Sequence, residues 1–400
     1  MAVSDEELRR LDSLLGVGLR LVRSAPSGLV LMARLADAIE PEWLPGPQGQ
    51  AIADELLAAR AEALDPIGFG EVERILEAAW DADPSEELSE LDPDPIAVTP
   101  SSQVHRGKLA DDDRAVAVKV LRPGLAATIR QDLALLEGLL APLTGAFPAL
   151  DAGALLAEVR ERTLEEFDLE SEAATQRRVH RALRRHPFLT VPAPVMRLCH
   201  DEVLVSEFVD GVPLWDAPDP DQAAARLVVF VVGGGRAGIV HADPDPDDVL
   251  VLEDGRLAIL DFGAVRDPDV ERVALVADAL EALIAEDERA FGASLEQLGW
   301  LPAGHARTAL DLVNDVLGDL VGVEPARLDG EAVMAARDRL RERPGPAVEV
   351  LMAGRLSPED LWPARAVAQL VSTIARVGAT AVWREVVRAA LREGWQADAG

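Results

Sequence analysis

An aspartate follows a short apolar run in the second half of the chain. The residues Ile259 and Leu260 lead into Asp261, Phe262 and Gly263, so the carboxylate stands at the C-terminal end of an expected strand. Phosphoryl transfer requires hard oxygen ligands for Mg²⁺ beside the β- and γ-phosphates of a nucleotide, and such an aspartate supplies one. A strand that merely ends in a turn could carry the same three residues. Asp261 is therefore a candidate magnesium ligand, and other site residues are needed to distinguish this role from that of a simple turn.

A lysine lies within an alternating apolar segment. Alternation places Val116, Val118 and Val120 on one face of a strand and Lys119 on the other. A lysine that points inward needs a negative partner, because burying an unpaired ammonium is costly. An exposed edge strand could also carry a lysine. Of the 39 basic residues, however, only Lys108 and Lys119 are lysines, so a cation needed only for solvation would be arginine. This bias favours a specific role for Lys119, such as binding nucleotide phosphates.

Two further aspartates complete the candidate site. Asp243 lies 18 residues before Asp261, which is about the spacing of the catalytic-loop and metal-binding aspartates in protein kinases. Asp248 stands five residues later, where kinases carry an asparagine that binds a second Mg²⁺. The segment 243–248 also has carboxylates at alternate positions, as in a calcium loop. An EF-hand would need glycine where Asp248 stands, which disfavours calcium.

An acidic stripe precedes these loops in the chain. Its members recur at spacings of three and four, which places them on one face of a helix. The stripe consists of Glu158, Glu161, Glu165, Asp168 and Glu172. Most of these carboxylates are expected to face solvent, but one is expected to pair with Lys119.

The elements that must position these residues follow from periodicity and from glycine and proline breaks. Helices are expected first, then an acidic linker or short exposed helix over 81–95, and then a region that contains strands. Asp254-Gly255 predicts a hairpin turn, and the chain after Pro268 is expected to be helical. The expected helices are 5–40, 51–64, 69–80, 126–143, 151–185 and 222–232, and the expected strands are 103–109, 115–121, 203–208, 249–252 and 257–260.

The composition excludes several classes of protein. A net charge of -32 disfavours non-specific binding to nucleic acid or to an anionic bilayer, since both depend on cations. Cys199 is the only cysteine, which rules out an intrachain disulfide. Neither a signal peptide nor an apolar run long enough for a transmembrane segment is visible. We therefore expect a cytoplasmic protein, with peripheral membrane association as the alternative.

Together these segments resemble the UbiB/AarF family of atypical kinases. The segment 116–124 (VAVKVLRPG) is similar to that family's lysine strand, and 165–174 (EEFDLESEAA) is similar to its ExD element and following glutamate. The segment 203–214 (VLVSEFVDGVPL) resembles the hinge strand and its turn. The segments 241–244 (HADP) and 260–264 (LDFGA) resemble the catalytic and metal loops. The motifs occur in order across residues 50–300.

The resemblance implies an ATP and Mg²⁺ site and links to lipid or isoprenoid-quinone metabolism. Lys119 would contact the α- and β-phosphates and Glu172 would hold it. Asp243 would be the catalytic-loop aspartate, and Asp261 and Asp248 would bind Mg²⁺. The remaining implied site residues are the ExD carboxylates Glu166 and Asp168 and the hinge residues Glu207 and Val209, which would flank adenine.

Three family features are altered in this sequence. The KxGQ signature is missing, and its nearest counterpart, residues 31–34 (LMAR), has no lysine. Residues 97–102 (AVTPSS) replace an alanine-rich nucleotide loop. Residues 245–248 (DPDD) replace the sequence HPGN, so added negative charge would repel phosphate unless cations neutralise it. Crowded carboxylates should also have raised pKa values.

We accordingly expect an α+β, two-lobed, protein kinase-like fold. The predicted parts are a helical N-terminal extension (1–90), a kinase-like N-lobe (91–208) and a helical C-lobe (209–400). The favoured function is that of an atypical kinase or ATPase. The alternatives are a pseudokinase that binds nucleotide or a protein partner without turnover, and a small-molecule phosphotransferase.

Overall fold

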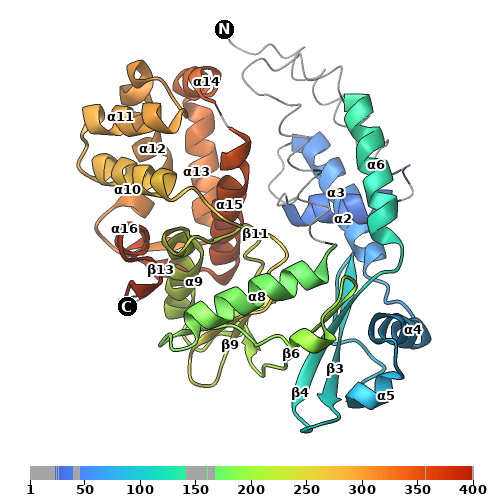
Figure 1. The fold of residues 1–400 in the computed structure, drawn as a ribbon. Helices are drawn as coiled ribbons and strands as arrows, with labels where there is room; N and C mark the ends of the chain where they lie inside the picture. The colour runs from blue at the N-terminus through green and yellow to red at the C-terminus, as the bar shows by residue number, and fades with distance from the viewer. Residues whose placement is uncertain are drawn as a thin grey trace.

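The chain folds into two lobes, one built on an antiparallel sheet and the other mainly helical (Figure 1). The computed structural model describes residues 27–38, 46–140, 167–355 and 357–398, together with Arg23, Ala25 and Arg160. Helix α8 (Leu169–Leu183) runs between the small sheet and the helical lobe. The α+β, two-lobed class expected from the sequence is confirmed.

The small lobe contains a five-stranded sheet in the order β1-β3-β4-β6, with β2 also paired to β3. All pairs are antiparallel, and Val118 of β4 faces His105 of β3 and Val205 of β6. The strands are β1 (Leu88–Leu91), β2 (Ala97–Val98), β3 (Ser102–Leu109), β4 (Ala115–Leu121) and β6 (Val203–Glu207). The central position of β4 explains its run of β-branched residues.

Strand β4 shows the predicted alternation. Val116, Val118 and Val120 are completely buried and pack with helix α4 (Phe69–Trp80), whereas Lys119 projects from the opposite face. Burying each valine stabilises the fold by about 1.5–3 kcal/mol, relative to leaving it exposed. Packing of the valine face therefore fixes the direction in which Lys119 points.

Residues 81–95 contain more structure than a linker. Helix α5 (Pro84–Glu87) is the short helix allowed by the sequence, but Leu88–Leu91 then forms β1 and pairs with β3. The strand was not predicted, because its alternation spans only four residues and follows an acidic, proline-bearing run. It crosses the expected boundary between the extension and the N-lobe.

A buried carboxylate joins the N-terminal extension to the small lobe. Helices α2 (Gly28–Ala38) and α3 (Gly46–Ala63) pack together, and α6 (Leu125–Leu140) lies beside them. Asp132 of α6 accepts hydrogen bonds from the backbone N–H and the hydroxyl of Ser27, both at 2.6 Å. Ser27 immediately precedes α2, so Asp132 satisfies a donor at the start of that helix.

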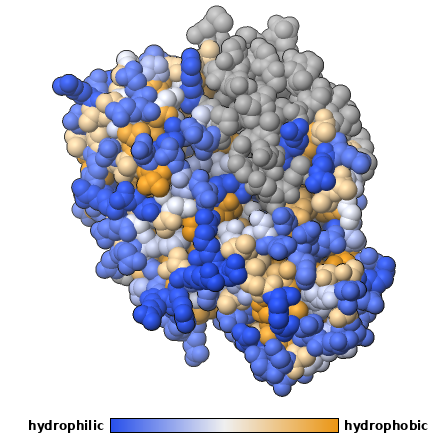
Figure 2. Space-filling view, in the orientation of Figure 1, coloured by the Kyte–Doolittle hydropathy of each residue, from blue (hydrophilic) through white to orange (hydrophobic). Residues whose placement is uncertain are grey.

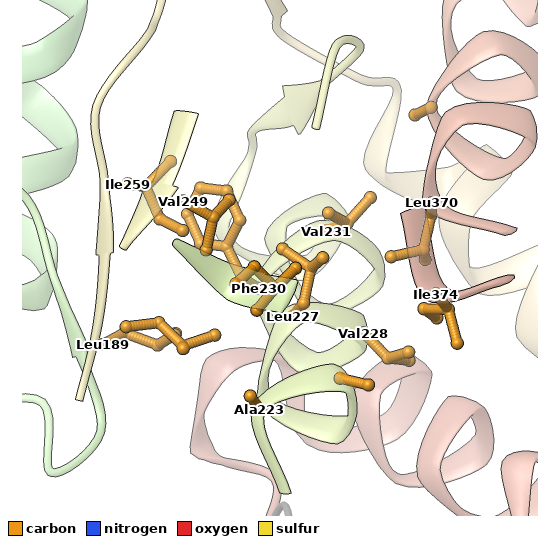
Figure 3. Packing of buried hydrophobic residues seen from close by; sticks show 14 of the residues in the cluster. Leu189, Ala223, Leu227, Val228, Phe230, Val231, Val249, Ile259, Leu370 and Ile374 are labelled. Carbon is orange, nitrogen blue, oxygen red and sulfur yellow. The ribbon is translucent and has the colours of Figure 1, made fainter. Parts of the chain in front are cut away.

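The core of the larger lobe forms around α9 (Pro220–Gly234). Apolar residues cover most of this helix, and α15 (Pro358–Val377) and the hairpin of β9 (Val249–Val251) and β10 (Leu257–Ile259) pack on it (Figure 3). Phe230 lies near the centre of this cluster and is 1% exposed. Leu370 and Ile374 of α15 approach the helix from one side, while Val249 and Ile259 approach from the other.

The hairpin that leads to Asp261 forms as predicted. Strands β9 (Val249–Val251) and β10 (Leu257–Ile259) are antiparallel, and Gly255 turns the chain with φ of 80°. Positive φ is readily adopted by glycine. The same small sheet includes β5 (Leu189–Thr190) and β7 (Val212–Pro213).

The C-terminal part is helical except for one pair of short strands. Strands β12 (Ala326–Leu328) and β13 (Ala379–Ala381) correct the expectation of a purely helical segment. They are too short for a detectable period-two pattern. The remaining helices are α10 (Val270–Ile284), α11 (Glu288–Leu298), α12 (Ala306–Leu317), α13 (Gly330–Glu342), α14 (Pro344–Ala353) and α16 (Trp383–Glu393).

Hydrophilic residues cover much of the visible surface, and apolar residues form separate patches (Figure 2). Among the helices that the structure describes, none combines the length and the apolar character needed to cross a bilayer.

Candidate active site

Lys119 joins the two lobes through a pair of carboxylates. Its Nζ lies 2.9 and 3.0 Å from the two carboxylate oxygens of Glu172, and 2.8 Å from Oδ2 of Asp261. Glu172 comes from α8, whereas Asp261 follows strand β10. The structure thus brings together three of the predicted site residues, and Glu172 is a member of the acidic stripe that pairs with Lys119. The stripe members Glu158, Glu161 and Glu165 lie outside the described residues.

One ammonium shared by two carboxylates sets their protonation. Burial opposes the charge on Lys119, but attraction by Asp261 and then Glu172 raises the pKa of Lys119 above its ordinary value. Burial alone would raise the pKa of Asp261, yet the Lys119 ammonium lowers it to about 2. Burial and then the charge of Asp261 raise the pKa of Glu172 to about 7, despite the opposing effect of Lys119. Asp261 is therefore ionised at neutral pH, while Glu172 is close to its titration point.

The start of α8 places Glu172 at Lys119. Asp168 is the N-cap residue, and its carboxylate accepts a hydrogen bond from the Ser171 backbone N–H at 2.9 Å. An N-cap aspartate stabilises a helix by about 1 kcal/mol. Glu172 follows one turn later and is 5% exposed. Asp168 thus acts on the start of the helix rather than on Lys119, and Glu166 lies outside the described residues.

A column of aromatic rings supports the loops of the site. Phe262 packs edge-on against His241, which packs against Phe230, and Phe230 stacks on Trp395. The His241 Nε2–H donates to the backbone carbonyl of Asp261 at 2.6 Å. Burial lowers the pKa of His241, which keeps the ring neutral at physiological pH. His241 therefore connects the loop of Asp243 to the loop of Asp261.

Asp243 is held by helix α15. Nη2 of Arg365 lies 2.7 Å from Oδ2 of Asp243. The Thr373 hydroxyl, also on α15, donates to the backbone carbonyl of Pro244 at 2.9 Å. The loop is therefore fixed at two points by residues more than 120 positions away.

The carboxylates after Asp243 affect one another. Burial, followed by the charges of Asp261, Asp245 and Asp243, raises the pKa of Asp248 well above its ordinary value. This agrees with the sequence argument about crowded carboxylates. The side chain of Asp245 accepts the Asp247 backbone N–H and begins a short 3₁₀ turn, Pro246–Asp248.

The donor set fits magnesium bound together with phosphate. Mg²⁺ commonly takes one or two protein carboxylates together with substrate phosphates and water. Asp261 and Asp248 could supply those carboxylates. Within the described ranges, no group of three or more histidine, cysteine or acidic side chains is arranged to hold an ion by itself.

Residues 61–295 match the model of the ABC1 atypical kinase-like domain. The chain belongs to the ABC1 atypical kinase-like family. The resemblance to UbiB-type kinases inferred from the sequence is therefore confirmed.

Two curated ABC1-family relatives show how far the similarity extends. A probable protein kinase UbiB of Marinobacter nauticus is 29% identical over 263 residues, which cover 62% of this chain and 48% of the relative. The chloroplastic protein "Activity of bc1 complex kinase 1" of Arabidopsis thaliana is 30% identical over 225 residues, covering 54% and 33%. The aligned regions thus span between a third and a half of these relatives.

A solved structure shares the fold across nearly the whole chain. The Rv3197–erythromycin complex from Mycobacterium tuberculosis matches with a TM-score of 0.63 at 22% identity. The match covers 96% of this chain and 97% of that one. The shared fold therefore extends to the C-terminal helices, including α15.

The two residues that the sequence predicts at the hinge, Glu207 and Val209, lie at the end of β6. The Glu207 backbone N–H donates to the Ala193 carbonyl at 2.9 Å, and its carboxylate contacts Arg114 and the Ala193 N–H. Val209 follows the strand. Glu207 is thus held in place by its own contacts, and adenine contacts at these two residues stay a prediction.

An arginine holds residues 97–102, where the sequence predicts the nucleotide loop. Residues 97–98 form β2, and Thr99 and Ser102 hydrogen-bond within the turn to β3. Nη2 of Arg122 donates to the backbone carbonyls of Ala63 (2.9 Å), Asp65 (2.7 Å) and Thr99 (3.4 Å). Arg122 therefore links helix α3 and its following turn to this loop.

The sequence did not single out Arg365 or Arg122 as site-supporting residues. Arg365 is one of 37 arginines and has no motif around it. The only sequence signal was indirect: the acidic segment 245–248 required a compensating cation. Arg122 lies in the family-like Arg-Pro-Gly segment, which marked its position but not its contacts.

Proposed function

We propose that this chain binds ATP with Mg²⁺ between its two lobes and hydrolyses it or transfers its γ-phosphoryl group. The observation that carries this proposal is the contact of Lys119 with both Glu172 and Asp261. A cation placed between a helix carboxylate and the Asp-Phe-Gly aspartate is the arrangement that kinase-type phosphoryl transfer requires.

Each site residue then has a defined task. Lys119 binds the α- and β-phosphates, and Glu172 holds its ammonium in place. Asp261 and Asp248 supply oxygen ligands for Mg²⁺, which when bound neutralises charge on the β- and γ-phosphates. Asp243 orients the attacking hydroxyl or water. Glu207 and Val209 border the adenine.

The hydrolysis of Mg·ATP tests this proposal. Lys119→Ala and Asp261→Asn should each lower kcat/KM by at least about 100-fold, because each removes a charge at the phosphates. Lys108→Ala is the matched control, because Lys108 is the only other lysine and forms an exposed pair with Glu90. Equal activity in all four proteins would contradict the proposal.

A second candidate is nucleotide binding without turnover. The observation that favours it is the Arg365 contact, which engages one oxygen of the proposed catalytic aspartate Asp243. In that case the wild type would bind Mg·ATP, and Lys119→Ala would weaken binding, but no protein would release phosphate. Measuring binding and phosphate release on the same samples separates the two candidates.

A further inference from the structure

We propose that Arg365 is a charge-compensating and positioning residue that allows the triphosphate of Mg·ATP to approach the acidic loop 243–248. This inference rests on the proposed nucleotide function and assigns part of the site to helix α15. Residue 365 lies outside the segment 61–295 that matches the ABC1 domain model.

The first argument is the charge around the phosphate site. Six carboxylates belong to the site or its loop, and they are Glu172, Asp243, Asp245, Asp247, Asp248 and Asp261. Lys119 pairs with Glu172 and Asp261, and Arg365 pairs with Asp243. Lys119 serves the carboxylates of α8 and the metal loop. Arg365 therefore brings a positive charge to the catalytic loop.

The second argument is that Arg365 is held in place. The carbon at the centre of its guanidinium lies 5.5 Å from the centre of the Trp362 ring, which is 5% exposed. Arginine favours this stacking, which restricts the orientations of the guanidinium. The Arg365 side chain is itself only 22% exposed, so its charge is incompletely screened by water.

The third argument is the place where Trp362 packs. Trp362 clusters with Ala242 and Ala264, which directly precede Asp243 and follow Gly263. The Ala242 N–H donates to the Ala264 carbonyl at 2.8 Å, so the catalytic and metal loops are joined at this point. Packing of Trp362 therefore places Arg365 next to the point where the two loops are joined.

The geometry leads to a specific electrostatic consequence. With Arg365 present, Asp243 and its partner contribute no net charge toward an incoming triphosphate. Without Arg365, the Asp243 carboxylate adds to the negative charge of its loop and repels the nucleotide. Repulsion between charges in a partly buried site is far stronger than in bulk water. Affinity for ATP should fall, while affinity for uncharged adenosine should not.

Isothermal titration of Mg·ATP and of adenosine tests this inference without requiring turnover. Arg365→Met should raise the Kd for Mg·ATP by about tenfold or more and leave the Kd for adenosine within about twofold. Arg365→Lys should retain affinity close to that of the wild type. Asp243→Asn should bind Mg·ATP at least as tightly as the wild type. The double variant Arg365→Met/Asp243→Asn should recover the affinity lost in Arg365→Met, because the carboxylate that Arg365 pairs with is then neutral as well.

The control is Arg388→Met, which removes a similar arginine–carboxylate pair between α16 and α10. It should leave both affinities unchanged. Three results would overturn the inference: unchanged Mg·ATP affinity in Arg365→Met, equal losses for ATP and adenosine, or no recovery in the double variant. If Arg365→Met does not fold, weaker Mg·ATP binding by Asp243→Asn would still contradict it. Failure of the wild type to bind Mg·ATP would instead overturn the proposed function itself.

Discussion

The ammonium of Lys119 lies 2.8 Å from Oδ2 of Asp261, although 142 residues separate them in the sequence. Lys119 belongs to the sheet of the small lobe, and Asp261 follows a strand of the larger lobe. This ion pair therefore links the small lobe directly to the larger lobe. The consequences of this pair and of the contacts around it can be measured.

Glu172 should make stability depend on pH. Its pKa is raised to about 7 in the folded chain from an ordinary value of 4.5, so the folded state binds more protons between these values. Stability contributed by this group is then present below about pH 4.5 and is lost as pH rises to about 7. Urea unfolding of the wild type should show a loss of about 2–3 kcal/mol from this group between pH 5 and 7.5.

The variant Glu172→Gln removes that titrating group. The difference between its stability at pH 5 and at pH 7.5 should be smaller than in the wild type by the same amount. Parallel pH profiles for the two proteins would show that Glu172 has an ordinary pKa.

Arg122→Ala should loosen the contact between helix α3 and the loop 97–102. The substitution removes donors to three backbone carbonyls, and a lost hydrogen bond of a charged group costs about 1.5–3 kcal/mol. Urea unfolding should therefore show a loss of about 2 kcal/mol or more. Arg307→Ala, which removes an exposed helical pair with Asp311, should cost less than about 0.5 kcal/mol. Equal losses would mean that the Arg122 contacts contribute little.

Asp132→Ala should release helix α2 from α6. Asp132 is 4% exposed and accepts two hydrogen bonds from Ser27, so its loss leaves buried donors unsatisfied at a cost of about 1–3 kcal/mol. Hydrogen exchange of the α2 amides should become faster, while exchange in β4 should change less. Asp54→Ala, which removes an exposed acceptor on neighbouring α3, is the control. Unchanged exchange in α2 would exclude Asp132 as the anchor of this helix.

The sequence predicted the parts of the fold that depend on local pattern. The hairpin of β3 and β4, helix α4 and the turn at Gly255 each depend on periodicity or turn chemistry within about 20 residues. The burial of the valine face explains why the direction of Lys119 was also predictable. The order of the motifs that resemble the family then paired Lys119 with Glu172. Periodicity alone could not show which of the five carboxylates of the acidic stripe would pair with Lys119.

Long-range contacts were not predictable in the same way. Strand β1 and the β12–β13 pair have three or four residues each, too few for alternation to be distinguished from chance. Arg365 meets Asp243 only because α15 packs on the core of the larger lobe. Such a contact requires the tertiary structure, since nothing in the spacing of residues 243 and 365 indicates it.

The most direct test of the ATP and Mg²⁺ assignment is the dependence of ATP affinity on Mg²⁺ in the wild type and in Asp261→Asn. Isothermal titration should show that Mg²⁺ tightens ATP binding by the wild type by about tenfold or more, equivalent to 1.4 kcal/mol. Asp261→Asn should show little or no such gain, because it lacks the carboxylate that holds the ion against the phosphates. The same gain in both proteins, or no binding of ATP by the wild type, would contradict the account.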